Sequence, residues 1–247
     1  MALRPWSSIP IVDNNEPLLD LPAEFLRLEP HPYRTVGAPY GDHGSPFRLR
    51  SGVIERLQRA QQQLREKRPG WRLAIFDAWR PLEVQAYMVE HTIAAECARL
   101  GIAAAVDSPQ REAVLAEVGR FWAPPSADLA TPPPHSTGAA IDLTLADAGD
   151  AVVEMGSEID ALGDVSEPDH YLNVADGLPD GELRRQVLCW HGNRSLLAEA
   201  MAAAGFVCHP NEWWHFSWGD QLWAWRSGQA QACYGRWLPC GSAGGCG

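Results

Sequence analysis

The sequence is 247 residues long and 46% of its residues are hydrophobic, so the chain can bury a substantial core, and its length fits one large domain about as well as two small ones. Its formal net charge of −11 at pH 7 leaves no basic surface to neutralise phosphates, and we therefore expect no nucleic acid partner. No stretch approaches the roughly 18 apolar residues of a membrane span, and the first residues lack the pattern of a signal peptide. We expect a small solute as the partner and no membrane contact.

The cysteines are spread through the chain and form no CxxC pair, which argues against a zinc finger and against a disulfide scaffold. The six are Cys97, Cys189, Cys208, Cys233, Cys240 and Cys246. We therefore expect a reducing, cytoplasmic location. Residues 226–247 form a tail in which Cys240 and Cys246 could bind a metal or pair under oxidation, although glycine-rich ends are usually flexible.

The first part of the chain, residues 1–50, is rich in Pro, Gly and turn-forming residues, which predicts an irregular N-terminal arm or short strands laid over the core. An amphipathic helix is predicted over residues 52–68, because apolar residues recur there at spacings of three and four. Pro69 and Gly70 end it. The apolar positions are Val53, Ile54, Leu57, Ala60 and Leu64.

Residues 72–76, with the sequence RLAIF, are typical of a short buried strand. The segment DAWRP follows, and its last residue, Pro81, is suited to open a helix over residues 82–100. Arg80 is thereby predicted at a strand-to-helix junction. A further helix is expected over residues 110–122.

The next prolines predict a rigid, extended loop that ends at His135. They are Pro124, Pro125, Pro132, Pro133 and Pro134. Residues 140–145 then alternate as in a strand, with Ile141 and Leu143 on one face and Asp142 on the other. A carboxylate is therefore expected to project away from the apolar layer.

A helix is predicted over residues 193–204, ended by Gly205, and is followed by a short strand FVC and the aromatic segment WWHFSW. Helices mixed with short strands that hairpins can join favour an α+β fold over a regular βαβ array. The whole chain, residues 1–247, is expected to form a single domain.

Two segments carry residues that suit a metal site. His135 and Asp142 lie on either side of a glycine turn, and Glu212 and His215 lie within four residues of each other far downstream. Two imidazoles and one carboxylate are suitable ligands for Zn²⁺ and would leave the fourth tetrahedral position open for water, which is typical of catalytic zinc sites.

Each of these residues also has an ordinary structural interpretation. Asp142 on a buried strand must be paired or bind a metal, and Arg80 is a candidate partner. A lone histidine is more often a hydrogen-bonded core or surface residue than a ligand, and we expect this of most of the others. These are His31, His43, His91, His170, His191 and His209.

The patterns HxxGxAxD and ExWH together resemble the zinc D-alanyl-D-alanine dipeptidases, the VanX-like family, which is related to zinc D-Ala-D-Ala carboxypeptidases and to the hedgehog signalling domain. The resemblance implies that His135, Asp142 and His215 hold one Zn²⁺ per chain and that Glu212 is the catalytic base. It also implies a single α+β domain with a central, mainly antiparallel sheet flanked by helices.

Two further segments resemble elements of the same family. DAWRP is similar to a D-x-x-R-P element whose arginine stabilises the transition state, which implies this role for Arg80. MGSEID is similar to an element whose aspartate takes the substrate's amino group, which implies this role for Asp160. We expect Trp213 and Trp214 to contribute to the substrate pocket.

The likeness covers residues 54–218, within an expected catalytic core of residues 52–218. Two positions differ from the family pattern: Pro133 lies where the resistance enzymes have a serine, and Ile159 replaces a phenylalanine. The implied function is zinc-dependent hydrolysis of the D-alanyl-D-alanine dipeptide. The alternatives are a D,D-carboxypeptidase acting on longer muramyl peptides and a non-catalytic zinc-bearing interaction domain.

Overall fold

A computed structural model of the chain describes residues 4–41, 44–103 and 106–238. Its centre is a five-stranded sheet in which β2 and β4 run parallel and every other pair is antiparallel. In spatial order the strands are β2 (Leu26–Arg27), β4 (Arg72–Asp77), β5 (Ala140–Ala146), β7 (Glu212–Ser217) and β6 (Val207–His209). The expected α+β fold with a mainly antiparallel sheet is confirmed.

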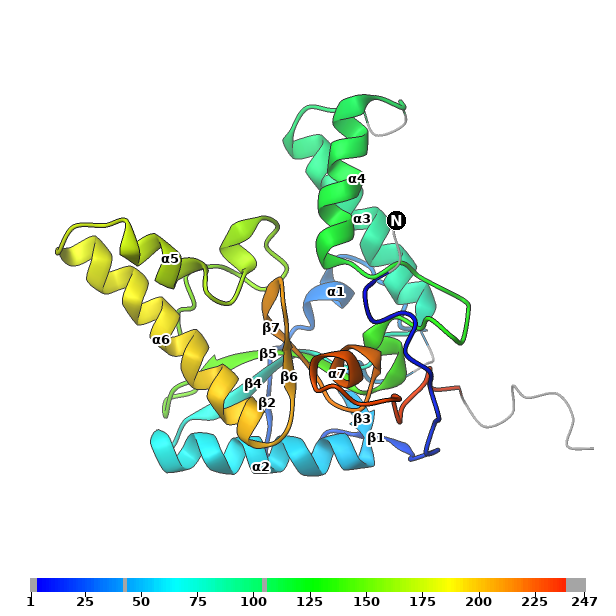
Figure 1. Cartoon of the computed structure of the whole chain (residues 1–247), viewed down its shortest axis with the longest axis horizontal. Coiled ribbons are helices and arrows are strands. Elements are labelled where there is room, and N and C mark those ends of the chain that lie inside the picture. The colour runs from blue at the N-terminus through cyan, green and yellow to red at the C-terminus, as the bar shows by residue number, and fades with distance from the viewer. Residues whose placement is uncertain (1–3, 42–43, 104–105, 239–247) are drawn as a thin grey trace, which may run out of the picture.

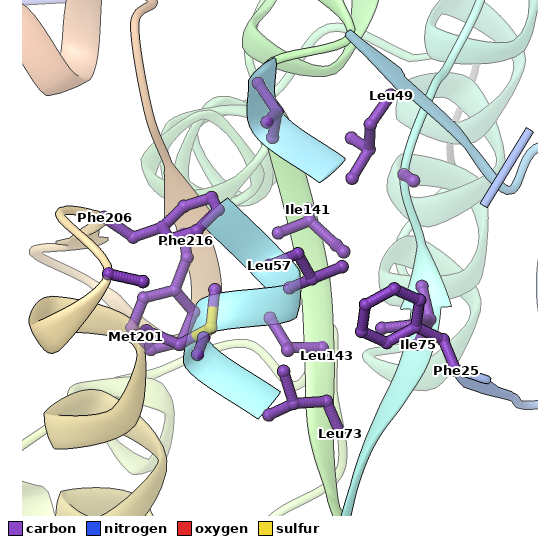
Figure 2. Close-up of a cluster of buried hydrophobic side chains, with 14 of the residues drawn as sticks. Phe25, Leu49, Leu57, Leu73, Ile75, Ile141, Leu143, Met201, Phe206 and Phe216 are labelled. Carbon is purple, nitrogen blue, oxygen red and sulfur yellow. The ribbon is translucent and has the colours of Figure 1, made fainter. Parts of the chain in front are cut away.

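The main core lies between this sheet and two helices, α2 (Ser51–Lys67) and α6 (Glu182–Ala203). The apolar face predicted for α2 is the face it buries. Figure 2 shows Leu57 of α2 against Ile141 and Leu143 of β5. Burial of such side chains contributes about 1.5–3 kcal/mol each and fixes the position of β5, which carries Asp142.

A second apolar cluster forms where α3 (Leu82–Arg99) and α4 (Pro109–Phe121) pack together. Both helices lie within a residue of their predicted bounds and project from the side of the sheet opposite α2 (Figure 1). Ser108 starts α4 in the manner typical of a helix cap, since its side chain accepts a hydrogen bond from the backbone N–H of Arg111.

The N-terminal arm contains short strands, one of the two forms expected for it. Within residues 1–50, β1 (Leu18–Asp20) pairs with β3 (Arg48–Arg50), α1 (Pro32–Thr35) forms a short helix, and β2 joins the central sheet. Elements of two to four residues have no periodicity to detect, because their stability comes from the partner strand or from packing.

The chain after residue 226 also returns to the core as far as residue 238. Ala232 donates to the carbonyl of Pro10 at 2.9 Å, Trp237 donates to that of Ser136 at 3.0 Å, and Tyr234 is fully buried. The predicted flexible tail with Cys240 and Cys246 lies outside the described residues.

The remaining elements are η2 (Pro134–Thr137), η3 (Asp164–Ser166), α5 (His170–Asp176) and α7 (Gln221–Arg226). In the described part of the chain no helix has both the length and the apolar character needed to cross a membrane.

Candidate active site

The structure brings the three predicted metal ligands together. Asp142 on β5 and His215 on β7 are directly opposed in the antiparallel register, and His135 reaches them from η2. Nε2 of His135 lies 3.1 Å from Oδ2 of Asp142, and Nδ1 of His215 lies 3.1 Å from Oδ1 of the same carboxylate. All three side chains are buried, and one donor atom from each lies within 4.8 Å of the other two.

A glycine turn connects His135 to the strand that carries Asp142. Gly138 has a φ of 71°, in the left-handed region that favours glycine. A Cβ built there would lie 2.4 Å from Cδ1 of Leu18 and 3.5 Å from Cγ of Arg50. The turn therefore depends on glycine both for its backbone conformation and for its close packing.

Each histidine is oriented by a hydrogen bond on the side away from the cluster. Nδ1 of His135 donates to the carbonyl of Ala78 at 2.6 Å, which leaves Nε2 free to bind a cation. Nε2 of His215 lies 3.3 Å from Oγ of Ser217, and that hydroxyl donates to Asp220 at 2.8 Å. Both rings therefore turn their other nitrogen toward Asp142.

The charge state of Asp142 follows from the same neighbours. Burial alone would raise the pKa of this carboxyl, but the rings of His135 and His215 hold its pKa well below the usual range. The carboxylate is therefore ionised, as a metal ligand must be.

Arg80 lies beside the cluster, and its buried guanidinium donates to four groups. Nε donates to Asp77 at 3.0 Å and Nη1 to Gln85 at 3.0 Å, while Nη2 donates to Tyr33 at 3.1 Å and to Asp142 at 3.2 Å. Arg80 and Asp142 thus form the ion pair that we considered as an alternative to metal binding. The two histidines still face the same carboxylate, so the ion pair and the three-residue cluster are both present.

Asp160 lies in the same pocket, on the loop between β5 and α5. The hydroxyl of Tyr33 donates to its Oδ2 at 2.8 Å, so Tyr33 connects Asp160 to Arg80. Its φ of 65° is unusual for a residue other than glycine. Burial, together with the nearby charge of Asp142, raises the pKa of Asp160 to about 7.

Glu212 begins β7 and is 6% exposed. Its Oε2 lies 3.6 Å from Nδ1 of His215 and its buried Oε1 lies 3.4 Å from Nδ1 of His209, although Oε1 makes no hydrogen bond to any described residue. Burial and the charges of Asp142 and Asp160 raise the pKa of Glu212 well above its usual value. A carboxylate held near the ligands without joining them, and with a raised pKa, is suited to accept a proton.

These side chains line one pocket of about 470 Å³, counting the space that opens to solvent. Trp214 lies in its wall as expected. Trp213 does not: its indole N–H donates to Oγ of Ser157 at 3.0 Å and its ring lies 5.1 Å from the guanidinium of Arg194. Because successive residues of a strand point to opposite sides, Trp213 supports the loop that carries Asp160 instead of facing the substrate space.

Four residues that our sequence reasoning did not select also contribute. Tyr33, Asp77 and Gln85 hold Arg80, and Arg4 lines the pocket from the N-terminal arm. The DAWRP segment carried a signal for Asp77, three residues before Arg80. The other three had none, because only the folded chain brings them to the pocket.

The residues present fit a divalent cation. Three acidic side chains, Asp142, Asp160 and Glu212, line the pocket, and within the described chain Arg80 forms an ion pair with Asp142 alone among them. Three carboxyl groups next to two imidazoles whose remaining nitrogens face Asp142 are donors suited to a bound cation. Two nitrogen donors and one carboxylate are a ligand set that Zn²⁺ accepts at catalytic sites.

Comparison with known proteins identifies relatives along most of the chain. A D-alanyl-D-alanine dipeptidase of Synechocystis sp. (strain ATCC 27184 / PCC 6803 / Kazusa) is 44% identical over 242 residues, which cover 95% of this chain and 97% of that protein. A D-alanyl-D-alanine dipeptidase of Escherichia coli (strain K12) is 29% identical over 147 residues, covering 60% of this chain and 55% of that protein.

Among solved structures, a mutant of the vancomycin resistance D,D-pentapeptidase VanY in complex with Zn(II) covers 91% of this chain and 96% of its own, with 16% identity and a TM-score of 0.44. The model of the M15 peptidase family described as D-ala-D-ala dipeptidase matches residues 27–233. This match includes every residue that the motifs selected, and it confirms the resemblance drawn from them. The chain belongs to the D-ala-D-ala dipeptidase family of M15 peptidases.

Proposed function

We propose that this protein is a zinc dipeptidase that hydrolyses D-alanyl-D-alanine to free D-alanine, with one Zn²⁺ per chain. The observation that carries the proposal is the cluster of His135, Asp142 and His215 with the carboxyl group of Glu212 beside it, 3.6 Å from His215. The dipeptidase of Synechocystis, aligned over almost the whole chain, supports the choice of substrate.

The chemistry divides between a cation and two side chains. A zinc ion held by the three ligands would supply the positive charge that polarises the scissile carbonyl and acidifies water. Glu212 takes the proton of the attacking water and passes it to the amine that leaves. Arg80 stabilises the oxyanion as it forms, and its donors are already fixed in place by Asp77 and Gln85.

Asp160 binds the amino group of the substrate. A free ammonium that enters a pocket must find an anionic partner. Asp160 lies in the pocket wall, and the hydrogen bond from the Tyr33 hydroxyl fixes the orientation of its carboxyl group. Binding of the ammonium favours the ionised form of the carboxyl, whose pKa is otherwise raised to about 7. This contact makes a free amino terminus part of what the site recognises.

The test combines turnover with metal binding. Zinc-loaded protein is incubated with D-Ala-D-Ala and, in parallel, with L-Ala-L-Ala, with and without a chelator, and released alanine is measured. Chelator-sensitive cleavage of the D,D form alone is expected. Glu212→Gln is expected to retain one zinc per chain by metal analysis but to lose roughly 10²- to 10⁴-fold in kcat. Full activity of this variant would refute the proton-transfer scheme.

A second candidate, a D,D-carboxypeptidase acting on longer muramyl peptides, is separated by a peptide with a blocked amino terminus. The dipeptidase is expected to cleave it far more slowly than D-Ala-D-Ala.

We also propose a cytoplasmic location, where a free dipeptide would be met and where the described cysteines would stay reduced. These are free thiols at Cys97, Cys189, Cys208 and Cys233.

A further inference from the structure

The N-terminal segment, residues 4–12, forms part of the wall of the catalytic pocket. Trp6 is buried there, with its ring centroid 5.6 Å from that of His209 and 5.5 Å from that of Trp225. Nε2 of Gln221 donates to the carbonyl of Ile9 at 2.6 Å. Figure 1 shows this segment as the dark blue trace near α7 and the base of α4. The pocket wall therefore includes the N-terminal segment, which α7 holds in place.

Arg4 is the residue of this segment that brings charge to the pocket. Its Nη1 donates to the carbonyl of Arg120 at 3.0 Å, and its remaining side-chain donors, Nε and Nη2, make no hydrogen bond to the described residues. No described carboxylate lies within ion-pair distance of it. Burial lowers the pKa of Arg4, while the charge of Glu212 opposes that shift. The guanidinium remains charged and lacks an anionic partner.

The other arginine of the pocket differs from Arg4 in this respect. Arg80 is held by two carboxylates, Asp77 and Asp142, and by two neutral side chains. Four of its five N–H groups therefore have partners in the protein, and the one that remains, on Nη1, is left for the proposed contact with the oxyanion. Nε and Nη2 of Arg4 form one edge of a guanidinium that matches a carboxylate with two parallel hydrogen bonds.

The pocket wall near Arg4 offers no second cation without an anionic partner among the described residues. Pro134 lies in the same wall, and it has no backbone N–H to donate, nor has Pro133 before it. Trp6 and Trp122 add mainly apolar surface with one indole N–H each, and His209 adds an imidazole that its lowered pKa keeps neutral. A ligand carboxylate that enters this side of the pocket therefore has Arg4 as its cationic partner.

We propose that Arg4 binds the C-terminal carboxylate of the substrate, so that the N-terminal segment supplies the anchor for a free carboxyl end. This inference rests on the proposed dipeptidase function and names a residue that the function requires. A dipeptide is a zwitterion, and its ammonium is assigned to Asp160. The same pocket would then hold one charge-complementary partner for each end of the substrate.

The experiment compares D-Ala-D-Ala with its C-terminal amide, which lacks the carboxylate but keeps the scissile bond. Arg4→Met keeps an unbranched apolar stem and removes the charge. It is expected to reduce kcat/KM for D-Ala-D-Ala by roughly 10- to 100-fold and to change kcat/KM for the amide by less than about threefold. Arg4→Lys keeps a charge but loses the pair of parallel donors. Its kcat/KM for D-Ala-D-Ala is expected to lie between those of Arg4→Met and the unaltered protein.

Arg184→Met is the matched control. Arg184 is partly exposed and donates through Nε to the carbonyl of Ala175 at 3.2 Å, so it also connects a guanidinium to a backbone carbonyl, but on α6 and outside the pocket lining. Both substrates are expected to be cleaved by this variant as by the unaltered protein. A purely structural role of Arg4, through its bond to Arg120, would instead slow acid and amide by the same factor and would overturn the proposal.

Binding is measured separately from turnover by calorimetry in zinc-loaded Glu212→Gln protein. Adding Arg4→Met is expected to raise the Kd of D-Ala-D-Ala roughly 10- to 100-fold and to leave that of the amide unchanged. If D-Ala-D-Ala binds more tightly than its amide and this difference depends on Arg4, but the unaltered enzyme cleaves neither, the proposed reaction is refuted and the role of Arg4 as the anchor is supported. If D-Ala-D-Ala is cleaved and Arg4→Met does not change kcat/KM, the proposed reaction is supported and the role of Arg4 is refuted. Failure of the acid to bind more tightly than the amide would also overturn the role of Arg4.

Discussion

The loop that carries Asp160 depends on a single buried side chain. Arg194, in the middle of α6 and 3% exposed, donates to the carbonyls of Met155 at 2.8 Å, Glu167 at 2.9 Å and Val165 at 3.0 Å, and to Oγ of Ser157 at 2.9 Å. These acceptors lie on either side of Asp160 in the sequence. The substitution Arg194→Met removes all four hydrogen bonds while keeping an unbranched stem.

The magnitude follows from the groups left without a donor. A buried acceptor that loses its partner costs about 1–3 kcal/mol, and three carbonyls are affected, although parts of the loop reach solvent. The guanidinium also lies 4.6 Å from the ring of Tyr171 and 5.1 Å from that of Trp213, contacts worth about 0.5–1 kcal/mol each. We expect the free energy of unfolding to fall by about 3–5 kcal/mol, in the range found for breaking buried networks.

Urea denaturation and thermal unfolding measure this loss. A domain of this size is expected to lose about 2–4 °C of Tm per kcal/mol. Because the loop carries the proposed ammonium partner, KM for D-Ala-D-Ala should rise together with the loss of stability. Arg184→Met, on the same helix but partly exposed, is expected to change the free energy of unfolding by less than about 1 kcal/mol. A loss below about 1 kcal/mol for Arg194→Met would refute the reasoning.

Three further predictions concern the metal centre. Gly138→Ala places a Cβ 2.4 Å from Leu18, so the turn after His135 must shift, and zinc affinity and Tm are both expected to fall in a competition and melting assay. Asp220→Asn keeps an oxygen that can accept from the backbone N–H of Trp223, but it alters the hydrogen bond that orients Ser217 and, through it, His215. Zinc affinity, measured by competition with a chelating indicator, is expected to fall about 10- to 100-fold with little loss of Tm. Removing zinc with a chelator is expected to lower the stability by about 2.7 kcal/mol relative to protein in zinc at 100 times its Kd, and an unchanged melting curve would contradict a folded-state metal site.

The long elements and the metal ligands could be predicted from the sequence because each has a local signal. Helices α3 and α4 have an opening proline and a clear end, and β5 alternates around Asp142. The first half of α6 was missed, since only residues 193–204 were predicted. Its first turns begin after a glycine, Gly181, and most of their side chains are not buried, so they carry little apolar periodicity.

The surroundings of the ligands could not be predicted, because they depend on contacts between distant parts of the chain. Tyr33 and Asp160 are separated by 127 positions, and Arg4 and Arg120 by 116. Tyr33 lies on a four-residue helix and Arg4 on an irregular segment. No periodicity in these segments distinguishes a side chain that enters the pocket from one that faces solvent.

The arrangement of charges explains how one pocket could separate a dipeptide from a longer peptide. On the proposed assignments, Asp160 pairs with the ammonium and Arg4 with the carboxylate, while Glu212 stays free for the water. A peptide extended at its amino end would place a neutral amide against Asp160 and leave that carboxylate without its cation. Leaving such a group unpaired costs about 1–3 kcal/mol or more, so the pocket discriminates by what the wrong substrate fails to satisfy as well as by space.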